Sequence, residues 1–229
     1  MNWENLVEQI APFVVRIQTQ FGYGTGYIFW QNETLCCIAT ANHVISPANN
    51  EGWEQPILIS QANGKWNRFY PNHRRILQNL EEGDSAAILV HKSDLIFPSQ
   101  CLPIWDFTRE IPIGTNVGWL GFPQIVDASF PVPSFFSGTI SNVFQKLHQY
   151  AIDGVAIHGV SGGPLFYKGT QNTPTVIGTV SSYFPNTVIT EGGKASWPGM
   201  SVAHSFTVFS SVVKDLQSLD QIEQNTKKT

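Results

Sequence analysis

The stretch Gly159-Val160-Ser161-Gly162-Gly163-Pro164-Leu165 carries the strongest structural signal in this chain of 229 residues. Three glycines around one serine predict a tight turn, because glycine adopts backbone conformations that side chains exclude. In such a turn the backbone N–H groups of Gly159 and Ser161 would point to one spot beside the Ser161 hydroxyl. The plainer interpretation is a glycine-rich turn that only connects two strands. Other segments must therefore decide whether Ser161 has a chemical role.

A histidine and an aspartate each occupy a position that would suit a partner of Ser161. The segment Ala39-Thr40-Ala41-Asn42-His43-Val44-Ile45 places His43 directly after an apolar strand. A lone histidine is more often structural, but imidazole is also the commonest base for activating a hydroxyl. In Gly83-Asp84-Ser85-Ala86-Ala87-Ile88-Leu89-Val90, a small and apolar run follows Asp84. An acid at the head of a strand is usually a turn residue, but this run would carry the carboxylate into a cleft.

Peptide hydrolysis without a metal requires a nucleophile, a base and a carboxylate that orients the base. Backbone donors for the developing oxyanion complete the requirement. Four other acids lack the apolar run that follows Asp84; they are Asp94, Asp106, Asp127 and Asp153.

In the order His, Asp, Ser, the three segments resemble the motifs of chymotrypsin-like serine peptidases, whereas α/β-hydrolases place the serine first. The resemblance implies a catalytic triad of His43, Asp84 and Ser161, with an oxyanion hole formed by the N–H groups of Gly159 and Ser161. It also implies an all-β fold of two antiparallel six-stranded β-barrels, with short N-terminal and C-terminal helices.

Further segments resemble the bacterial high-temperature-requirement (HtrA/Deg-like) branch, over roughly residues 13–213. They are Gly24-Thr25-Gly26-Tyr27-Ile28, Trp119-Leu120-Gly121-Phe122-Pro123, Ser137-Gly138-Thr139-Ile140-Ser141 and Ile177-Gly178-Thr179-Val180-Ser181. Val160 stands where digestive relatives keep an aspartate, so their N-terminus-dependent activation is not possible here. We expect no PDZ-like domain, and a loop over 183–197 that is longer than this branch suggests.

By offset from Ser161, the resemblance places the primary specificity pocket around four residues. Val155 should lie near its floor, and Ser181, Tyr183 and Gly199 on its walls. None of the four is acidic, so we expect a small or medium apolar residue before the scissile bond. His158 abuts the oxyanion turn, whereas the other histidines are expected to be surface or core residues.

Alternating short apolar segments predict strands joined by turns. The expected strands are 14–19, 24–30, 35–40, 56–60, 85–91, 116–120, 136–143, 155–158, 165–168, 176–181 and 200–203. Helical spacing predicts helices over 2–10 and 207–219. We expect a single peptidase domain over 1–219, with barrels over about 13–105 and 114–206, a connection over 105–114 and a polar tail over 220–229.

The composition narrows the function further. A formal net charge of −4 gives no electrostatic reason to bind nucleic acid, and no apolar run is long enough to span a membrane. The absence of a signal peptide and the odd number of cysteines predict reduced thiols in a cytoplasmic protein. A nucleophile at Cys36 or Cys37 stays open, although buried strand residues are the favoured interpretation. No metal site or cofactor is expected.

The sequence therefore predicts a serine endopeptidase whose partner is a protein or peptide substrate. Two alternatives remain. One is a catalytically silent peptide-binding module with the same fold, and the other is a peptidase that stays latent until a protein partner activates it.

Overall fold

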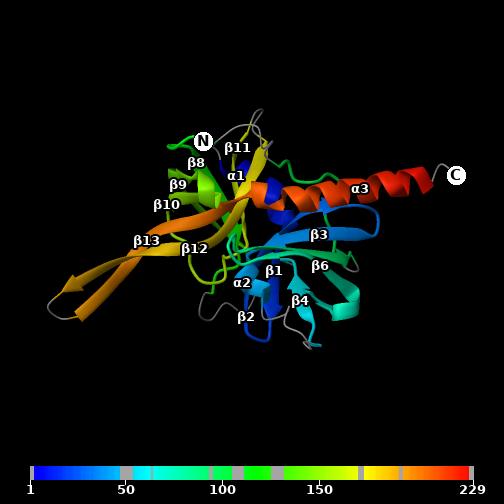
Figure 1. Cartoon of the computed structure of the whole chain (residues 1–229), viewed down its shortest axis with the longest axis horizontal. Helices are drawn as coiled ribbons and strands as arrows, with labels where there is room; N and C mark the ends of the chain where they lie inside the picture. The colour runs from blue at the N-terminus through cyan, green and yellow to red at the C-terminus, as the bar shows by residue number, and fades with distance from the viewer. Residues whose placement is uncertain are drawn as a thin grey trace.

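The molecule consists of two antiparallel β-sheet halves with a long helix at the C-terminal end (Figure 1). This computed structural model describes residues 3–46, 54–62, 64–92, 95–104, 111–124, 132–169, 173–190 and 193–226. The expected connection over 105–114 lies mostly outside the described residues, which resume at Ile111.

The N-terminal half is a curved sheet of seven strands in the order β5-β4-β1-β2-β3-β7-β6. Its strands are β1 (Val14–Thr19), β2 (Gly22–Gln31), β3 (Leu35–Thr40), β4 (Ile57–Ser60), β5 (Trp66–Phe69), β6 (Arg74–Leu80) and β7 (Ser85–His91). Side chains alternate between the two faces of each strand, so that Val15 and Ile17 point into the apolar core.

The C-terminal half is a closed barrel in the order β10-β13-β12-β11-β8-β9. Its strands are β8 (Asn116–Gly121), β9 (Ser134–Phe144), β10 (Gln149–Asp153), β11 (Pro164–Lys168), β12 (Pro174–Thr190) and β13 (Gly193–Ser205). A separate apolar core fills it, with Trp119 and Leu165 completely buried. This closed barrel and the curved N-terminal sheet confirm the predicted all-β double-barrel architecture. The N-terminal half has seven strands instead of six.

Among the described residues, three α-helices complete the fold: α1 (Trp3–Ile10), α2 (Asn42–Ile45) and α3 (Ser210–Thr226). The ring of Trp3 on α1 packs against Phe135 and Phe166 of the C-terminal barrel, with ring centroids 5.3 and 6.0 Å away. Helix α3 buries Val212 and Leu216. It continues through 220–226, part of the segment expected to be a polar tail. Within the described part of the chain, no helix combines the length and the apolar character that crossing a membrane requires.

Two segments differ from the sequence-based prediction. Residues 155–158, expected as a strand, form an irregular connection after β10. Their apolar alternation misled the prediction because the side chains of Val155 and Ile157 are exposed instead of packed in a barrel. Conversely, the expected loop over 183–197 belongs to the β12–β13 hairpin, which projects from the barrel as a long arm (Figure 1). The β-branched run Thr187-Val188-Ile189-Thr190 favours this extended structure.

Candidate active site

The glycine-rich turn lies between β10 and β11, where it packs against the N-terminal sheet. Gly159 and Gly162 both have φ of +91°, a conformation that other residues rarely adopt. A Cβ atom at Gly162 would lie 1.9 Å from the carbonyl oxygen of Thr25, and one at Gly163 would lie 2.1 Å from that of Leu120. The glycines therefore allow the turn to approach the backbone of both halves.

His43 and Asp84 come from different elements of the N-terminal half and form a close pair. His43 lies on the short helix α2, and its Nδ1 atom is 2.9 and 3.1 Å from the two carboxylate oxygens of Asp84. The His43 backbone N–H also donates to Asp84 Oδ1 at 2.9 Å. Because a carboxylate only accepts hydrogen bonds, Nδ1 is the donor in this contact, and in the neutral tautomer of the ring Nε2 is the acceptor.

The Asp84 carboxylate is held in its ionised form. Burial raises the pKa of Asp84. The hydrogen bonds and the charge of His43 lower it, as does a hydrogen bond from the Ser181 hydroxyl, so the pKa of Asp84 lies below its usual value. Asp84 has φ of +33°, a left-handed conformation that aspartate tolerates better than most residues. This turn at the head of β7 directs the side chain toward His43.

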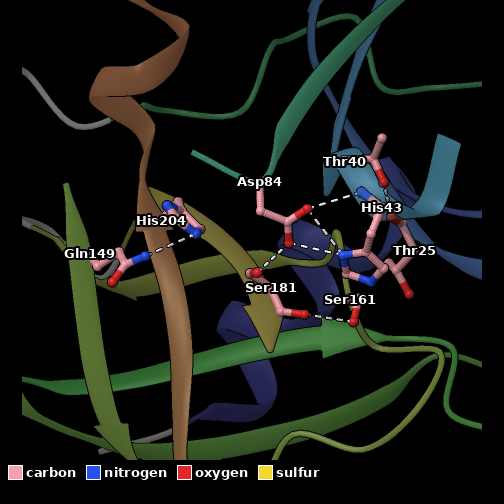
Figure 2. Close-up of polar contacts among 8 residues, drawn as sticks. All are labelled: Thr25, Thr40, His43, Asp84, Gln149, Ser161, Ser181 and His204. Carbon is pink, nitrogen blue, oxygen red and sulfur yellow. Dashed lines mark hydrogen bonds and ion pairs between the residues drawn. The ribbon is translucent and has the colours of Figure 1, made fainter. Parts of the chain in front are cut away.

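In the view of Figure 2, Ser161 lies below the His43 ring and Asp84 lies to its left. Its hydroxyl donates to the Ser181 carbonyl oxygen at 2.8 Å. Among the described residues, no hydrogen bond joins Ser161 to His43. The structure thus brings the three predicted residues together and links two of them directly, while Ser161 reaches Asp84 only through Ser181.

The backbone donors near Ser161 have a defined orientation. The His158 carbonyl accepts a hydrogen bond from the Gln124 N–H at 2.8 Å. Because C=O and N–H point in opposite directions across a trans peptide, the Gly159 N–H points away from Gln124. Within the part of the chain that the structure describes, neither the Gly159 nor the Ser161 N–H has an acceptor. Both are therefore available to an oxygen atom beside the Ser161 hydroxyl.

Thr25 on β2 anchors this turn, a role that the sequence interpretation missed. Its N–H donates to the Ser161 carbonyl at 2.8 Å, and its hydroxyl donates to the Gly159 carbonyl at 2.7 Å. The same hydroxyl accepts from the Phe122 N–H at 2.9 Å. Thr25 is completely buried. Its position between Gly24 and Gly26, which permit close backbone contact, was the available signal.

The residues expected around the specificity pocket differ in their exposure: Ser181 is buried, whereas Val155 and Tyr183 are exposed. Ser201 pairs with Tyr183 across β12 and β13, and its hydroxyl donates to the Gly154 carbonyl at 2.6 Å. Ser201 therefore connects Tyr183 to the segment containing Val155. Each of these two expected side chains is 48% exposed, so neither lies on the floor of a closed pocket. Gly199 precedes Ser201 by two residues on β13, and a Cβ there would lie 1.7 Å from the Phe184 carbonyl oxygen.

The alternative nucleophiles and carboxylates do not lie in environments that suit catalysis. Cys36 and Cys37 are buried in β3, and burial raises the pKa of the Cys36 thiol to about 12, so it stays protonated. Asp153 is exposed on β10, and Asp94, Asp106 and Asp127 lie outside the described residues. Among the described residues, no group of three histidine, cysteine or acidic side chains could hold a metal ion.

Comparison with known proteins identifies relatives of the fold. No protein-family model and no curated protein sequence matches the chain. Many solved structures do resemble it. Among them is the serine endoprotease from Yersinia pestis, with a TM-score of 0.63 and 20% identity over 94% of this chain and 66% of that chain. An inactive serine-to-alanine form of Rv3671c from M. tuberculosis has a TM-score of 0.59 and 15% identity over 93% of this chain and 90% of that chain. Deg5 has a TM-score of 0.59 and 18% identity over 85% of this chain and 87% of that chain.

These identities establish the fold alone. The chain spans 66% of the length of the Yersinia structure, which is less than two thirds. The resemblance to chymotrypsin-like proteins of the HtrA/Deg type is confirmed at the level of the fold.

Proposed function

We propose that this chain, which has the chymotrypsin-like double-barrel fold, is a serine endopeptidase with Ser161 as nucleophile, His43 as general base and Asp84 as the orienting carboxylate. The observation that carries the proposal is the contact of His43 Nδ1 with both carboxylate oxygens of Asp84. In the neutral imidazole this contact places the proton on Nδ1, so that Nε2 can accept the Ser161 proton.

Substrate binding would prepare Ser161 for attack. In the free protein its hydroxyl donates to the Ser181 carbonyl. An extended peptide that pairs with the edge of β12 brings its own backbone N–H to this carbonyl and displaces the hydroxyl. The Ser161 hydroxyl is then free to rotate toward His43.

The reaction proceeds through an acyl-enzyme. Ser161 Oγ attacks the peptide carbonyl carbon while its proton passes to His43 Nε2, and the Gly159 and Ser161 N–H groups stabilise the oxyanion. The C–N bond breaks as His43 protonates the leaving amine, which leaves an ester on Ser161. Water then attacks this ester and gives a proton to His43, and the second fragment is released as Ser161 recovers its proton.

A catalytically silent peptide-binding module is the second candidate. The missing hydrogen bond between Ser161 and His43 in the free protein favours it, because catalysis requires that link. The two candidates predict the same peptide-binding surface around Ser181, Tyr183, Val155 and Gly199, and they differ only in turnover.

A fluorophosphonate probe separates the candidates. The peptidase predicts covalent labelling that is lost in Ser161→Ala, together with a fall of roughly 10⁴-fold to 10⁶-fold in peptide cleavage. Ser182→Ala, which removes an exposed hydroxyl next to Ser181, is the matched control and should label normally. Cleavage that persists undiminished in folded Ser161→Ala would refute the assignment, and absence of labelling and cleavage in the wild type would support the binding module.

Two further properties belong to the proposal. The free thiols of Cys36 and Cys37 fit a reducing, cytoplasmic compartment. The enzyme would stay latent until an activating protein partner binds it. In that case, cleavage by the purified protein would be low and would rise on addition of a cell extract.

A further inference from the structure

Arg16 on β1 is held between two aromatic rings beside the candidate active site. Its guanidinium carbon lies 4.5 Å from the centroid of the Tyr23 ring and 5.3 Å from that of the Trp66 ring. Such stacking satisfies the faces of the guanidinium and leaves the N–H donors at its edge available. The side chain is partly buried, so its position is restricted.

No carboxylate pairs with this charge among the described residues. The one ion pair found there joins His43 to Asp84. A second cation lies on the same face of the sheet, because Arg68 follows Trp66 by two residues on β5 and its side chain is exposed. An unpaired guanidinium in a fixed orientation favours a planar anion such as a carboxylate.

Tyr23 connects Arg16 to the oxyanion turn. A Cβ atom at Gly159 would lie 2.9 Å from Cε2 of Tyr23, which places this ring against the backbone of the turn. Thr25 directs its N–H to the Ser161 carbonyl. Because backbone groups two residues apart on a strand point the same way, Tyr23 directs its own N–H and C=O toward the turn as well.

The two strands that flank the turn would each bind a different part of a peptide substrate. On one side, β12 approaches through the hydrogen bonds between Gly162 or Gly163 and Val180. On the other side, β2 approaches through Thr25 and Tyr23. If the acyl part of a peptide pairs with β12, the leaving part passes over Gly159 toward Tyr23 and Arg16.

We propose that Arg16 selects peptides with a carboxylate side chain on the leaving-group side of the scissile bond, at the second or third residue. The inference rests on the proposed peptidase function for the direction of the substrate. The Tyr23 and Trp66 rings orient the guanidinium, and Arg68 adds to the positive potential. For a partly exposed pair, we expect a preference for glutamate over glutamine of roughly fivefold, and a larger one over lysine.

Two measurements on the full chain test this selection. The first is kcat/KM for peptides that differ only in glutamate, glutamine or lysine at those two positions. The second is binding of the same peptides to Ser161→Ala by fluorescence anisotropy, which needs no turnover. Arg16→Met keeps the apolar stem and removes the charge, so it should abolish the preference, whereas Arg16→Lys should retain part of it. Arg75→Met removes an exposed arginine of β6 and should leave the preference unchanged.

The two readouts distinguish the possible failures. Equal binding of the three peptides, or a preference that survives in folded Arg16→Met, would overturn the role of Arg16. A preference that appears in binding, depends on Arg16 and is accompanied by no cleavage in the wild type would support the charge selection and refute the peptidase. Added salt should weaken a true preference, because the pair is partly exposed.

Discussion

The two halves of the molecule contribute to the candidate site in different ways. The N-terminal half supplies both His43 and Asp84. Three hydrogen bonds join these two residues directly, and none of the three involves a residue of the other half. The C-terminal half supplies Ser161, whose turn is anchored by Thr25 from the N-terminal half. The base and its carboxylate are thus assembled locally, whereas the position of the nucleophile depends on contacts between the halves.

This difference implies two ways to damage the site. A substitution within the N-terminal pair should remove the chemistry and leave the turn intact. A substitution at the contact between the halves should displace the nucleophile and leave the pair intact.

The largest effect is expected from Asp84→Asn, which breaks the N-terminal pair. An amide at this position can donate to His43 Nδ1 and so favours the wrong tautomer, with the proton on Nε2. We expect kcat to fall roughly 10⁴-fold. Peptide cleavage by the purified variant measures this, with Asp153→Asn on β10 as the control that should keep full activity. Near-normal cleavage by folded Asp84→Asn would show that Asp84 does not orient the base.

Thr25→Val should have the next largest effect, by acting on the contact between the halves. Valine has nearly the shape of threonine but lacks the hydroxyl that bonds the Gly159 carbonyl and the Phe122 N–H. The oxyanion donors should lose part of their alignment, and we expect kcat to fall roughly 30-fold with little change in KM. Thr25→Ser restores the hydroxyl and should recover most of the rate. A positional role for Thr25 requires this recovery, because lost packing alone would not be rescued by serine.

Ser181 contacts both Asp84 of the N-terminal half and Ser161 of the C-terminal half. We expect Ser181→Ala to have a smaller effect than Thr25→Val. It removes the hydroxyl that donates to Asp84 but keeps the carbonyl that faces Ser161. Asp84 retains its donors from His43, so we expect roughly a tenfold fall in kcat/KM. Steady-state kinetics measure the fall. A loss as large as that of Asp84→Asn would mean that Ser181, more than His43, holds the carboxylate.

The smallest effect concerns stability and its dependence on pH. The pKa of Asp84 is lowered in the folded protein, so its carboxylate stabilises the fold above the unfolded-state pKa of about 4. This contribution is lost as the pH falls through the folded-state value. The midpoint of thermal unfolding of Asp84→Asn should lie roughly 2–4 °C below the wild type at pH 7. The gap should close below about pH 4, and a gap that widens toward acid would contradict the sign of the pKa shift.

Much of the fold could be predicted from the sequence because its strands carry strong local signals. The apolar segments Val14–Thr19, Leu35–Thr40 and Ser85–His91 match β1, β3 and β7. Strands β5 and β6 escaped prediction because both are edge strands whose charged side chains, such as Arg68 and Arg75, obscure the alternation. Strand β10 is short, and the neighbouring Val155 and Ile157 attracted the assignment instead.

The site could be predicted only in part. The turn around Ser161 has a distinctive glycine pattern, and His43 and Asp84 each border a recognisable strand. The hydrogen bond from Ser161 to the Ser181 carbonyl has no local signal, because it joins residues 20 positions apart on separate elements. The anchoring by Thr25 is equally non-local, since it joins residues 134 positions apart.

The bonds from Thr25 to the Ser161 turn have a consequence for how the protein should respond to heat. A slight separation of the two halves would misalign the nucleophile while every strand stayed paired. Inactivation should therefore begin at a lower temperature than the loss of circular dichroism. In that interval, cooling should restore activity within the time that the halves take to dock.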